Sequence, residues 1–206
     1  TRSRADIDET CAKPMTVGIE MGGEARDRST LHRRLHHVQP GGVPEHELLD
    51  RVAYAEKIGA RTIYALGGEP AEHPDLLALL EAASLAVSSV SLQTMGHGFA
   101  TPGLARDARS AGLNGAVVDT FTADATLHDE LHSPGCHARW RRGVDALRDA
   151  DLELSARLVV TPRTAPGLEG TLRLLEALGL GISEVVWIDC GPRDFAHDLP
   201  NAVQHS

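Results

Sequence analysis

A turn of two glycines, a glutamate and a proline at residues 67–70 carries the clearest chemical signal in the sequence. It follows an apolar run rich in β-forming residues, 62–66, which predicts a buried strand. Two glycines let the backbone approach a ligand without an intervening Cβ atom, and Pro70 helps to end the strand. Because α/β folds bind ligands at the carboxyl ends of strands, Glu69 is a candidate ligand-binding carboxylate. The alternative interpretation is an ordinary strand-to-helix turn with a surface glutamate, which accounts for the same residues.

Carboxylates and imidazoles near several predicted strand ends could together bind a divalent ion such as zinc, manganese or magnesium. No short-spaced metal motif such as His-Glu-x-x-His occurs, and nothing in the sequence fixes the geometry of these side chains relative to one another. The weak candidates are Glu20, Glu69, His97, Asp119 and Asp189, with His32 as one further imidazole.

Histidines are frequent, with 11 in 206 residues. One group lies in a long polar segment, where a short helix over 30–38 would place two of its members on one face. A second group falls in a predicted loop and at the start of a helix. A solvated polar surface explains both groups. The first is His32, His36 and His37, and the second is His128, His132 and His137.

The three cysteines, Cys11, Cys136 and Cys190, are scattered. Their spacing argues against a disulfide scaffold and suits a reducing cytoplasm. Cys136 stands beside His137 at a helix start, which could lower the pKa of its thiol. Adjacent residues rarely orient a base on a neighbouring nucleophile, however, and we expect Cys136 to be a surface thiol. Cys190 ends a strand and is expected to be a small buried hydrophobe.

Composition narrows the class of protein. The chain is 42% hydrophobic and 24% charged, with a net charge of −9 and a pI near 5.6. No basic stripe is available to neutralise phosphates, so we expect no nucleic-acid partner. No run approaches the roughly 18 apolar residues of a membrane span, and the first residues do not resemble a signal peptide. We therefore expect a cytoplasmic protein with no membrane partner.

Six apolar segments predict strands centred near residues 18, 64, 91, 117, 157 and 187, with a helix, or room for one, between successive strands. This alternation predicts an α/β fold with a parallel sheet. No Gly-x-Gly-x-x-Gly follows the first strand, and the chain is short for an eight-unit barrel of about 250 residues. We predict a partial (β/α)6 barrel of the TIM type as one domain over 15–190, with a flexible arm at 1–14 and a polar tail at 191–206. The predicted helices are 45–58, 75–86, 102–111, 137–150 and 168–178, and 120–133 is predicted to be a loop.

An ordered set of short motifs resembles the radical S-adenosylmethionine superfamily, abbreviated radical SAM. The Gly-Gly-Glu-Pro turn is followed by His-Pro-Asp-Leu at 73–76 and by Ser-Leu-Gln-Thr-Met-Gly at 91–96. Gly-Leu-Asn-Gly-Ala-Val-Val at 112–118 resembles the family's Gly-Leu-Asp-Gly-Val strand. The segments 126–129, 143–147 and 158–162 continue the likeness in register. The resemblance covers about residues 15 to 190 and implies a partial barrel of six units, the fold that the strand count predicts independently.

The resemblance also implies a set of cofactor-binding residues. In the family the Gly-Gly-Glu-Pro turn contacts the amino group of the methionine moiety, which would assign Gly67, Gly68, Glu69 and Pro70 to S-adenosylmethionine. A carboxylate and turn carbonyls suit an ammonium group. Arg157 could pair with a carboxylate, or it could be a solvated strand-edge arginine. Asp119-Thr120-Phe121 replaces the Ser-Leu-Asp of many relatives, which changes the ribose-side contacts. The further cofactor-binding candidates are Gln93, Asp119 and Arg157.

One departure from the family changes the expected chemistry. The family binds a [4Fe–4S] cluster through Cys-x-x-x-Cys-x-x-Cys after the first strand, and the corresponding positions here are Ala25, Ser29 and His32. Cys11 lies before the strand and has no cysteine companion. Cluster binding needs thiolate ligands, with histidine an occasional substitute. We predict a degenerate motif that binds no cluster in the family's way and supports no reductive cleavage of S-adenosylmethionine.

Three functions remain open at this point. The first, which we favour, is a cluster-less, non-radical accessory or ligand-binding protein of a biosynthetic pathway. It could retain S-adenosylmethionine binding at the Gly-Gly-Glu-Pro turn, and it could pair with a protein partner in the same pathway. The second is a non-radical, metal-assisted enzyme that acts on a small metabolite at the barrel mouth. The third is a radical SAM enzyme with an unusually ligated cluster. The sequence alone leaves open whether the protein is an enzyme.

Overall fold

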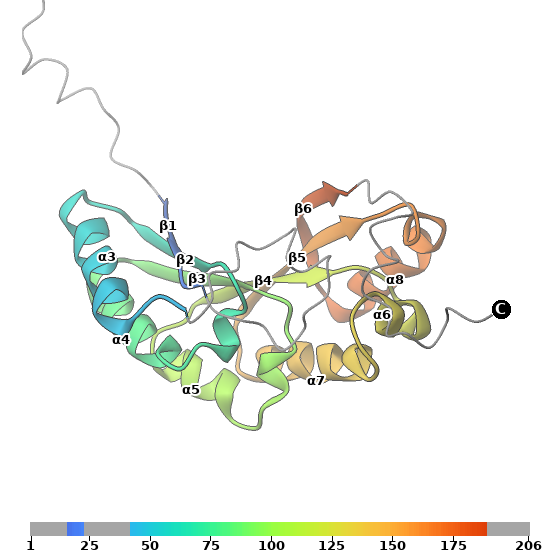
Figure 1. Cartoon of the computed structure of the whole chain (residues 1–206), viewed down its shortest axis with the longest axis horizontal. Coiled ribbons are helices and arrows are strands. Elements are labelled where there is room, and N and C mark those ends of the chain that lie inside the picture. Colours follow the sequence, from blue (N-terminus) through green and yellow to red (C-terminus); the bar gives the residue numbers. More distant parts are fainter. Residues whose placement is uncertain (1–15, 23–41, 189–206) are drawn as a thin grey trace, which may run out of the picture.

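Six parallel strands form one sheet whose spatial order follows the chain from β1 to β6 (Figure 1). The structure is a computed structural model that describes residues 16–22 and 42–188. The expectations for residues 1–14, 30–38 and 191–206, and those for Ala25, Ser29 and Cys190, lie outside the described residues. The strands are β1 (Thr16–Glu20), β2 (Thr62–Leu66), β3 (Ser89–Thr94), β4 (Gly115–Thr120), β5 (Glu153–Val160) and β6 (Gly181–Trp187).

Helices connect successive strands, as parallel pairing requires. None of them, within the described ranges, has both the length and the apolar character needed to cross a membrane. The α-helices are α3 (Glu45–Lys57), α4 (Leu76–Ala86), α5 (Leu104–Ser110), α6 (Ala125–Leu131), α7 (Cys136–Asp149) and α8 (Leu168–Leu178). Short 3-10 turns, η1 (Pro70–Glu72), η2 (Gly98–Ala100) and η3 (Ala165–Gly167), follow the ends of β2, β3 and β5.

The sheet is a partial barrel. Each strand pairs in parallel with the next one along the chain, and in the described part β1 and β6 remain the two edges. Figure 1 shows α3, α4, α5 and α7 following one another along one side of the sheet. The predicted α/β class, parallel sheet and six-unit partial barrel are therefore confirmed.

Alternating residues give the sheet two different faces, because successive strand side chains point in opposite directions. On β2, Ile63 and Ala65 belong to the large apolar core that the helices complete. Tyr64, between them, faces the other side of the sheet. On β4, Val118 lies in the core and Asp119 faces away from it. The helix-free face of the sheet is therefore the one that carries polar side chains.

Two predictions about the helices and strands were wrong. The segment predicted as a loop, 120–133, contains α6, whose start is capped by the carboxylate of Asp124 accepting from Thr126 N at 2.8 Å and Leu127 N at 3.0 Å. An aspartate immediately before a helical segment is a standard N-cap signal. The last strand begins at Gly181 rather than at residue 185.

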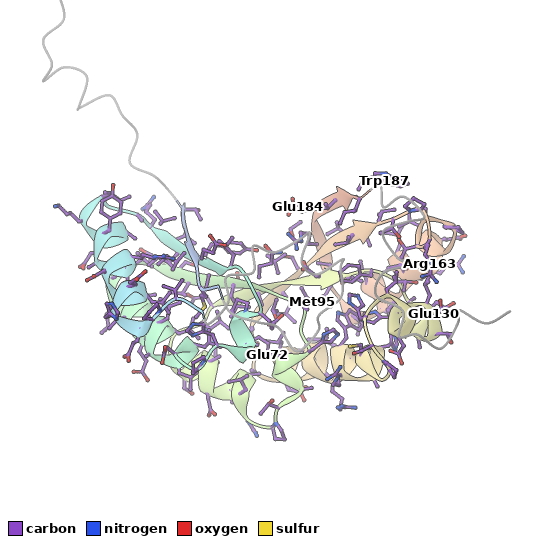
Figure 2. All side chains as sticks on the ribbon, viewed as in Figure 1. Glu72, Met95, Glu130, Arg163, Glu184 and Trp187 are labelled. Carbon is purple, nitrogen blue, oxygen red and sulfur yellow. The ribbon has the colours of Figure 1, made fainter. Side chains whose placement is uncertain are left out.

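The edge strand β6 is less covered than the others. Val185 and Trp187 are each 61% exposed. Figure 2 shows Glu184 and Trp187 on β6, and it also shows Arg163, which forms an ion pair with Glu130 of α6. This ion pair links the segment after β5 to α6.

A close backbone contact fixes α7 against the segment after β3. A Cβ atom built on Gly143 would lie 1.8 Å from the carbonyl oxygen of Gly96. Gly170, within α8, has no atom within 4 Å of the corresponding position. The two helical glycines therefore differ in the space around them.

We predict opposite effects for the same substitution at these two glycines. Gly143→Ala should lower the free energy of unfolding by about 1–3 kcal/mol, because α7 must move away from the backbone at Gly96. Gly170→Ala should raise it by about 0.5–1 kcal/mol, because alanine favours a helix more than glycine does. Urea denaturation of both variants measures the difference. Equal stability of the two variants would contradict the packing described here.

Candidate functional site

The Gly-Gly-Glu turn leaves β2 in a conformation that requires glycine. Gly67 has φ 83° and Gly68 has φ 57°, both in the left-handed region. A Cβ atom on Gly67 would lie 2.5 Å from Cγ of Glu20 at the end of β1. The missing side chain therefore allows the turn to pass directly beside the neighbouring strand end.

The carboxylate of Glu69 is turned into the protein, where its side chain is buried with the residue 4% exposed. Oε2 accepts from Met95 N at 2.7 Å, and Oε1 accepts from Ala71 N at 3.2 Å and from the hydroxyl of Thr94. Figure 2 shows Met95 in the middle of the molecule, beyond the end of β3. Glu69 thus caps η1 and ties the turn after β2 to the end of β3.

This geometry changes the expected role of Glu69. The sequence suggested direct contact between its carboxylate and a ligand ammonium group. In the structure both carboxylate oxygens already accept hydrogen bonds from within the protein. Glu69 therefore holds the backbone of the turn in place, and contact between its carboxylate and a ligand stays a prediction.

A buried ion pair occupies the polar face of the sheet. Arg157 Nε donates to Asp119 Oδ1 at 2.7 Å, and Arg157 Nη2 donates to Asp119 Oδ2 at 2.7 Å. Asp119 is fully buried and Arg157 is 8% exposed. Gln93 lies beside them, and turning its amide so that the oxygen faces the guanidinium would let it accept from Arg157 Nε at 3.1 Å. The structure thus brings three predicted site residues together from β3, β4 and β5.

The ion pair corrects the alternative reading of Arg157. A solvated strand-edge arginine is wrong, because the guanidinium is buried and bidentate on a carboxylate of its own chain. Bidentate arginine–carboxylate pairs are among the stronger polar contacts in proteins. A ligand carboxylate would have to compete with Asp119 for this group.

Tyr64 belongs to the same polar face and was not singled out from the sequence. Burial raises the pKa of its hydroxyl to about 12, the Asp119 carboxylate adds to the rise, and Arg157 opposes it. The hydroxyl therefore stays protonated near neutral pH and can donate a hydrogen bond. The only signal for Tyr64 in the sequence was its position between two core residues of a strand.

The carboxylates proposed for a metal at the barrel mouth are used in other ways. Glu20 packs beside Gly67, while Glu69 and Asp119 hold the contacts described above. Across 16–22 and 42–188, no group of three or more histidine, cysteine or acidic side chains is arranged so that it could hold a metal ion. His32 and Asp189 lie outside these residues. Among the candidates, His97 has a different set of neighbours.

A histidine cluster forms where the sequence gave no expectation of one. Its members are His97, His128, His132 and His137, and we use this name for them below. His128 contacts His97, His132 and His137, with ring centroids 5.9, 4.8 and 5.4 Å apart. Their positions along the chain did not show that the segment after β3 meets α6 and α7 here. The surface expected for the second histidine group is wrong for His128, which is buried.

Cys136 corrects a further expectation. Its side chain is fully buried and not a surface thiol. Sγ lies 3.0 Å from Ser133 Oγ and 2.9 Å from Arg139 Nη2, which donates to it. The sulfur is therefore enclosed by the start of α7.

Comparison with known proteins identifies the family. Residues 32–175 match the model of the radical SAM superfamily, and the chain belongs to this superfamily. The resemblance predicted from the ordered motifs is confirmed. No curated protein sequence matches the chain.

Solved structures share the fold at low sequence identity. Streptococcus suis SuiB bound to S-adenosylmethionine is 14% identical, with a TM-score of 0.67 over 90% of this chain and 43% of that one. The anSMEcpe structure with bound AdoMet is 16% identical, with a TM-score of 0.62 over 86% and 52%. Methylornithine synthase (PylB) is 10% identical, with a TM-score of 0.61 over 88% and 56%. The chain thus spans about half the length of these proteins.

We predict that removing one partner of the buried ion pair destabilises the protein more than replacing both partners does. Asp119→Asn should lower the free energy of unfolding by about 3–5 kcal/mol, because it leaves a buried guanidinium without its counter-charge. Replacing both partners, as in Asp119→Leu with Arg157→Met, should recover most of that loss. Urea denaturation measures each variant.

The matched control is the exposed pair of Glu169 and Arg173 on α8. Arg173→Ala should change stability by about 0.5 kcal/mol or less, because water screens the pair. If Asp119→Asn were no more destabilising than Arg173→Ala, the buried ion pair would contribute no more to the free energy of unfolding than an exposed pair does.

Proposed function

We propose that this protein binds S-adenosylmethionine at the Gly-Gly-Glu turn and acts as a non-radical accessory protein in a biosynthetic pathway. The observation that carries the proposal is the turn itself. Its left-handed glycines lie at the carboxyl end of β2, where parallel α/β folds bind ligands. Superfamily membership and the two S-adenosylmethionine-bound neighbours support this ligand.

The residues of the turn fit the amino group of the ligand. The carbonyls next to Gly67 and Gly68 can accept from an ammonium group, and no Cβ atom obstructs the approach. Glu69 holds this backbone through its bonds to Met95 N and Ala71 N. The nearby polar face supplies the protonated hydroxyl of Tyr64 and the amide of Gln93 as further polar groups.

The residues present do not fit a [4Fe–4S] cluster bound in the superfamily's way. Between residues 22 and 43 the sequence contains no cysteine, and alanine and serine occupy two of the three corresponding positions. Alanine has no donor atom, and such clusters are held by thiolates. A chain that binds S-adenosylmethionine without these ligands would act beside a partner that carries out the chemistry, which is why the proposal includes a protein partner.

We expect S-adenosylmethionine to raise the melting temperature of the purified chain. A ligand at 100 times its dissociation constant stabilises the folded state by about 2.7 kcal/mol. Gly67→Ala should abolish the shift, because the added methyl group meets Glu20 and distorts the turn. Differential scanning fluorimetry and isothermal titration calorimetry measure both effects.

Gly179→Ala is the matched control for the strained backbone. Gly179 also has a left-handed φ, 70°, but nothing lies within 4 Å of its missing Cβ atom. This variant should lose stability and keep the full shift. Iron and sulfide analysis on protein reconstituted without oxygen should find no cluster. Four irons per chain would overturn the non-radical proposal, and an absent ligand shift in the wild type would overturn the binding proposal.

We predict that Thr94 affects ligand binding without contacting the ligand. Thr94→Val removes the hydroxyl that donates to Glu69 and accepts from Gly96 N at 2.8 Å. Loss of one hydrogen bond to a buried charged group costs about 1.5–3 kcal/mol of stability, and a turn that is less firmly held should bind S-adenosylmethionine more weakly. Thr94→Ser keeps the hydroxyl and should restore the affinity, as titration calorimetry can show. Equal affinity in the valine variant and the wild type would contradict the positioning role of Glu69.

A further inference from the structure

Two regions that are distant in sequence, the segment after β3 and the consecutive helices α6 and α7, bring the four imidazoles of the histidine cluster together. His97 follows β3, His128 lies in α6, His132 is the residue that ends α6, and His137 lies in the first turn of α7. The ring centroids of His97 and His132 are 6.0 Å apart, and those of His128 and its three neighbours are 4.8–5.9 Å apart. His128 and His132 are four residues apart, a spacing that places two ligands on the same side of a helix.

The nitrogen atoms of this cluster are shielded from water. The Nε2 atoms of all four histidines are buried. His128 is 1% exposed, and neither of its ring nitrogens has a hydrogen-bond partner among the described residues. Burying polar groups without a partner costs roughly 1–3 kcal/mol each by mutational measures. Such a group in a folded protein calls for an explanation, and a bound ion is one of the ordinary explanations.

The protonation state of His128 suits metal coordination. Burial lowers the pKa of His128 to about 2, and the neighbouring His132, His97 and His137 lower it further. The ring is therefore neutral near pH 7, which is the form that binds metal ions. The carboxylate nearest in sequence, Asp129, accepts from Gly135 N at 2.7 Å and His137 N at 2.8 Å. It positions the start of α7 and leaves the imidazoles as the donor groups.

We propose that the histidine cluster binds one divalent transition-metal ion of the zinc type through three or four imidazoles. Imidazoles around a tetrahedral zinc ion, each bound at about 2.1 Å, have ring centres roughly 5 Å apart. The three distances among the rings of His97, His128 and His132, 4.8–6.0 Å, are close to this value, and the ring of His137 lies 5.4 Å from that of His128. Nitrogen donors without thiolates or carboxylates favour zinc, cobalt, nickel or copper over magnesium or calcium.

Ion binding requires the rings to turn but leaves the backbone in place. With the side chains as they stand, no group of three or more histidine, cysteine or acidic residues within 16–22 and 42–188 could hold a metal ion. The torsion between Cβ and Cγ of histidine is broad and roughly two-fold, so the rings can rotate at low cost. Rotation of His128 and His137 would bring buried nitrogens without hydrogen-bond partners toward their neighbours.

The site differs from the proposed S-adenosylmethionine site in both residues and chemistry. It joins α6 and α7 to the segment after β3. Trp140 stacks on His137 and donates from Nε1 to the carbonyl of Asp119 at 3.1 Å. An ion held here would therefore tie two helices to the ends of two central strands and stabilise that side of the partial barrel.

The test is titration of chelator-treated, full-length protein with Zn²⁺ and with Co²⁺. We expect one equivalent to bind, a rise in melting temperature, and the visible absorption bands of tetrahedral cobalt. His128→Leu and, separately, His137→Gln should weaken binding at least tenfold. His46→Gln, on the exposed face of α3, is the matched control and should bind as the wild type does.

Histidines outside the cluster are tested in parallel. A variant in which His32, His36 and His37 are all glutamine should retain the cobalt bands. If His128→Leu does not fold, X-ray absorption of the zinc-loaded triple variant gives an independent answer, and it should show at least three imidazoles in the first coordination shell. Failure of the wild type to bind, loss of the bands in the triple variant alone, or a shell made mainly of oxygen atoms would each overturn the proposal.

Discussion

A buried carboxylate must find hydrogen-bond donors, and in this protein that requirement joins the second and third strands. Glu69 leaves β2 after two left-handed glycines and accepts from the backbone of Met95 and from Thr94 at the end of β3. If the carboxylate lost these donors, its burial without hydrogen-bond partners would destabilise the turn. The position of the turn and the end of the neighbouring strand are therefore set together, and the backbone carbonyls of the turn are set with them.

The polar face of the sheet meets the same requirement for two buried charges, because each charge is the partner of the other. Parallel sheets are usually covered by helices on both faces and are apolar throughout. Here one face is apolar and covered, and the other carries the bidentate pair of Asp119 and Arg157 with Gln93 and Tyr64 beside it. The neighbouring strands supply the partner for each charge. A polar interior of this kind suits a small polar ligand better than it suits a structural core.

Much of the fold could be predicted from the sequence because the signals are local. The run 62–66 and the glycines after it define a strand and its turn, and the repeated strand–helix alternation fixes a parallel sheet in chain order. The pairing of Asp119 with Arg157 could not be read in the same way, because it depends on the register of β4 against β5. The sequence of a strand does not indicate whether its arginine side chain faces water or an aspartate.

The histidine cluster shows the limit of local reasoning most clearly. His97 and His128 are separated by a helix and a strand, and only the pairing of β4 with β3 and the packing of α6 and α7 place their rings 5.9 Å apart. The helix that carries His128 could have been found, since Asp124 is a good cap for it. The orientation of Glu69 likewise depended on donors 25 and 26 residues away.

The two tryptophans of this chain give it a built-in pair of optical reporters. Trp140 is buried against His137 and bonded to the backbone of β4, whereas Trp187 stands on the open edge strand and is 61% exposed. Their emission should therefore differ in colour and in accessibility to a dissolved quencher. The blue-shifted emission of Trp140 would report on the interior beside α7. The red-shifted emission of Trp187 would report on changes in the solvent exposure of the edge strand β6.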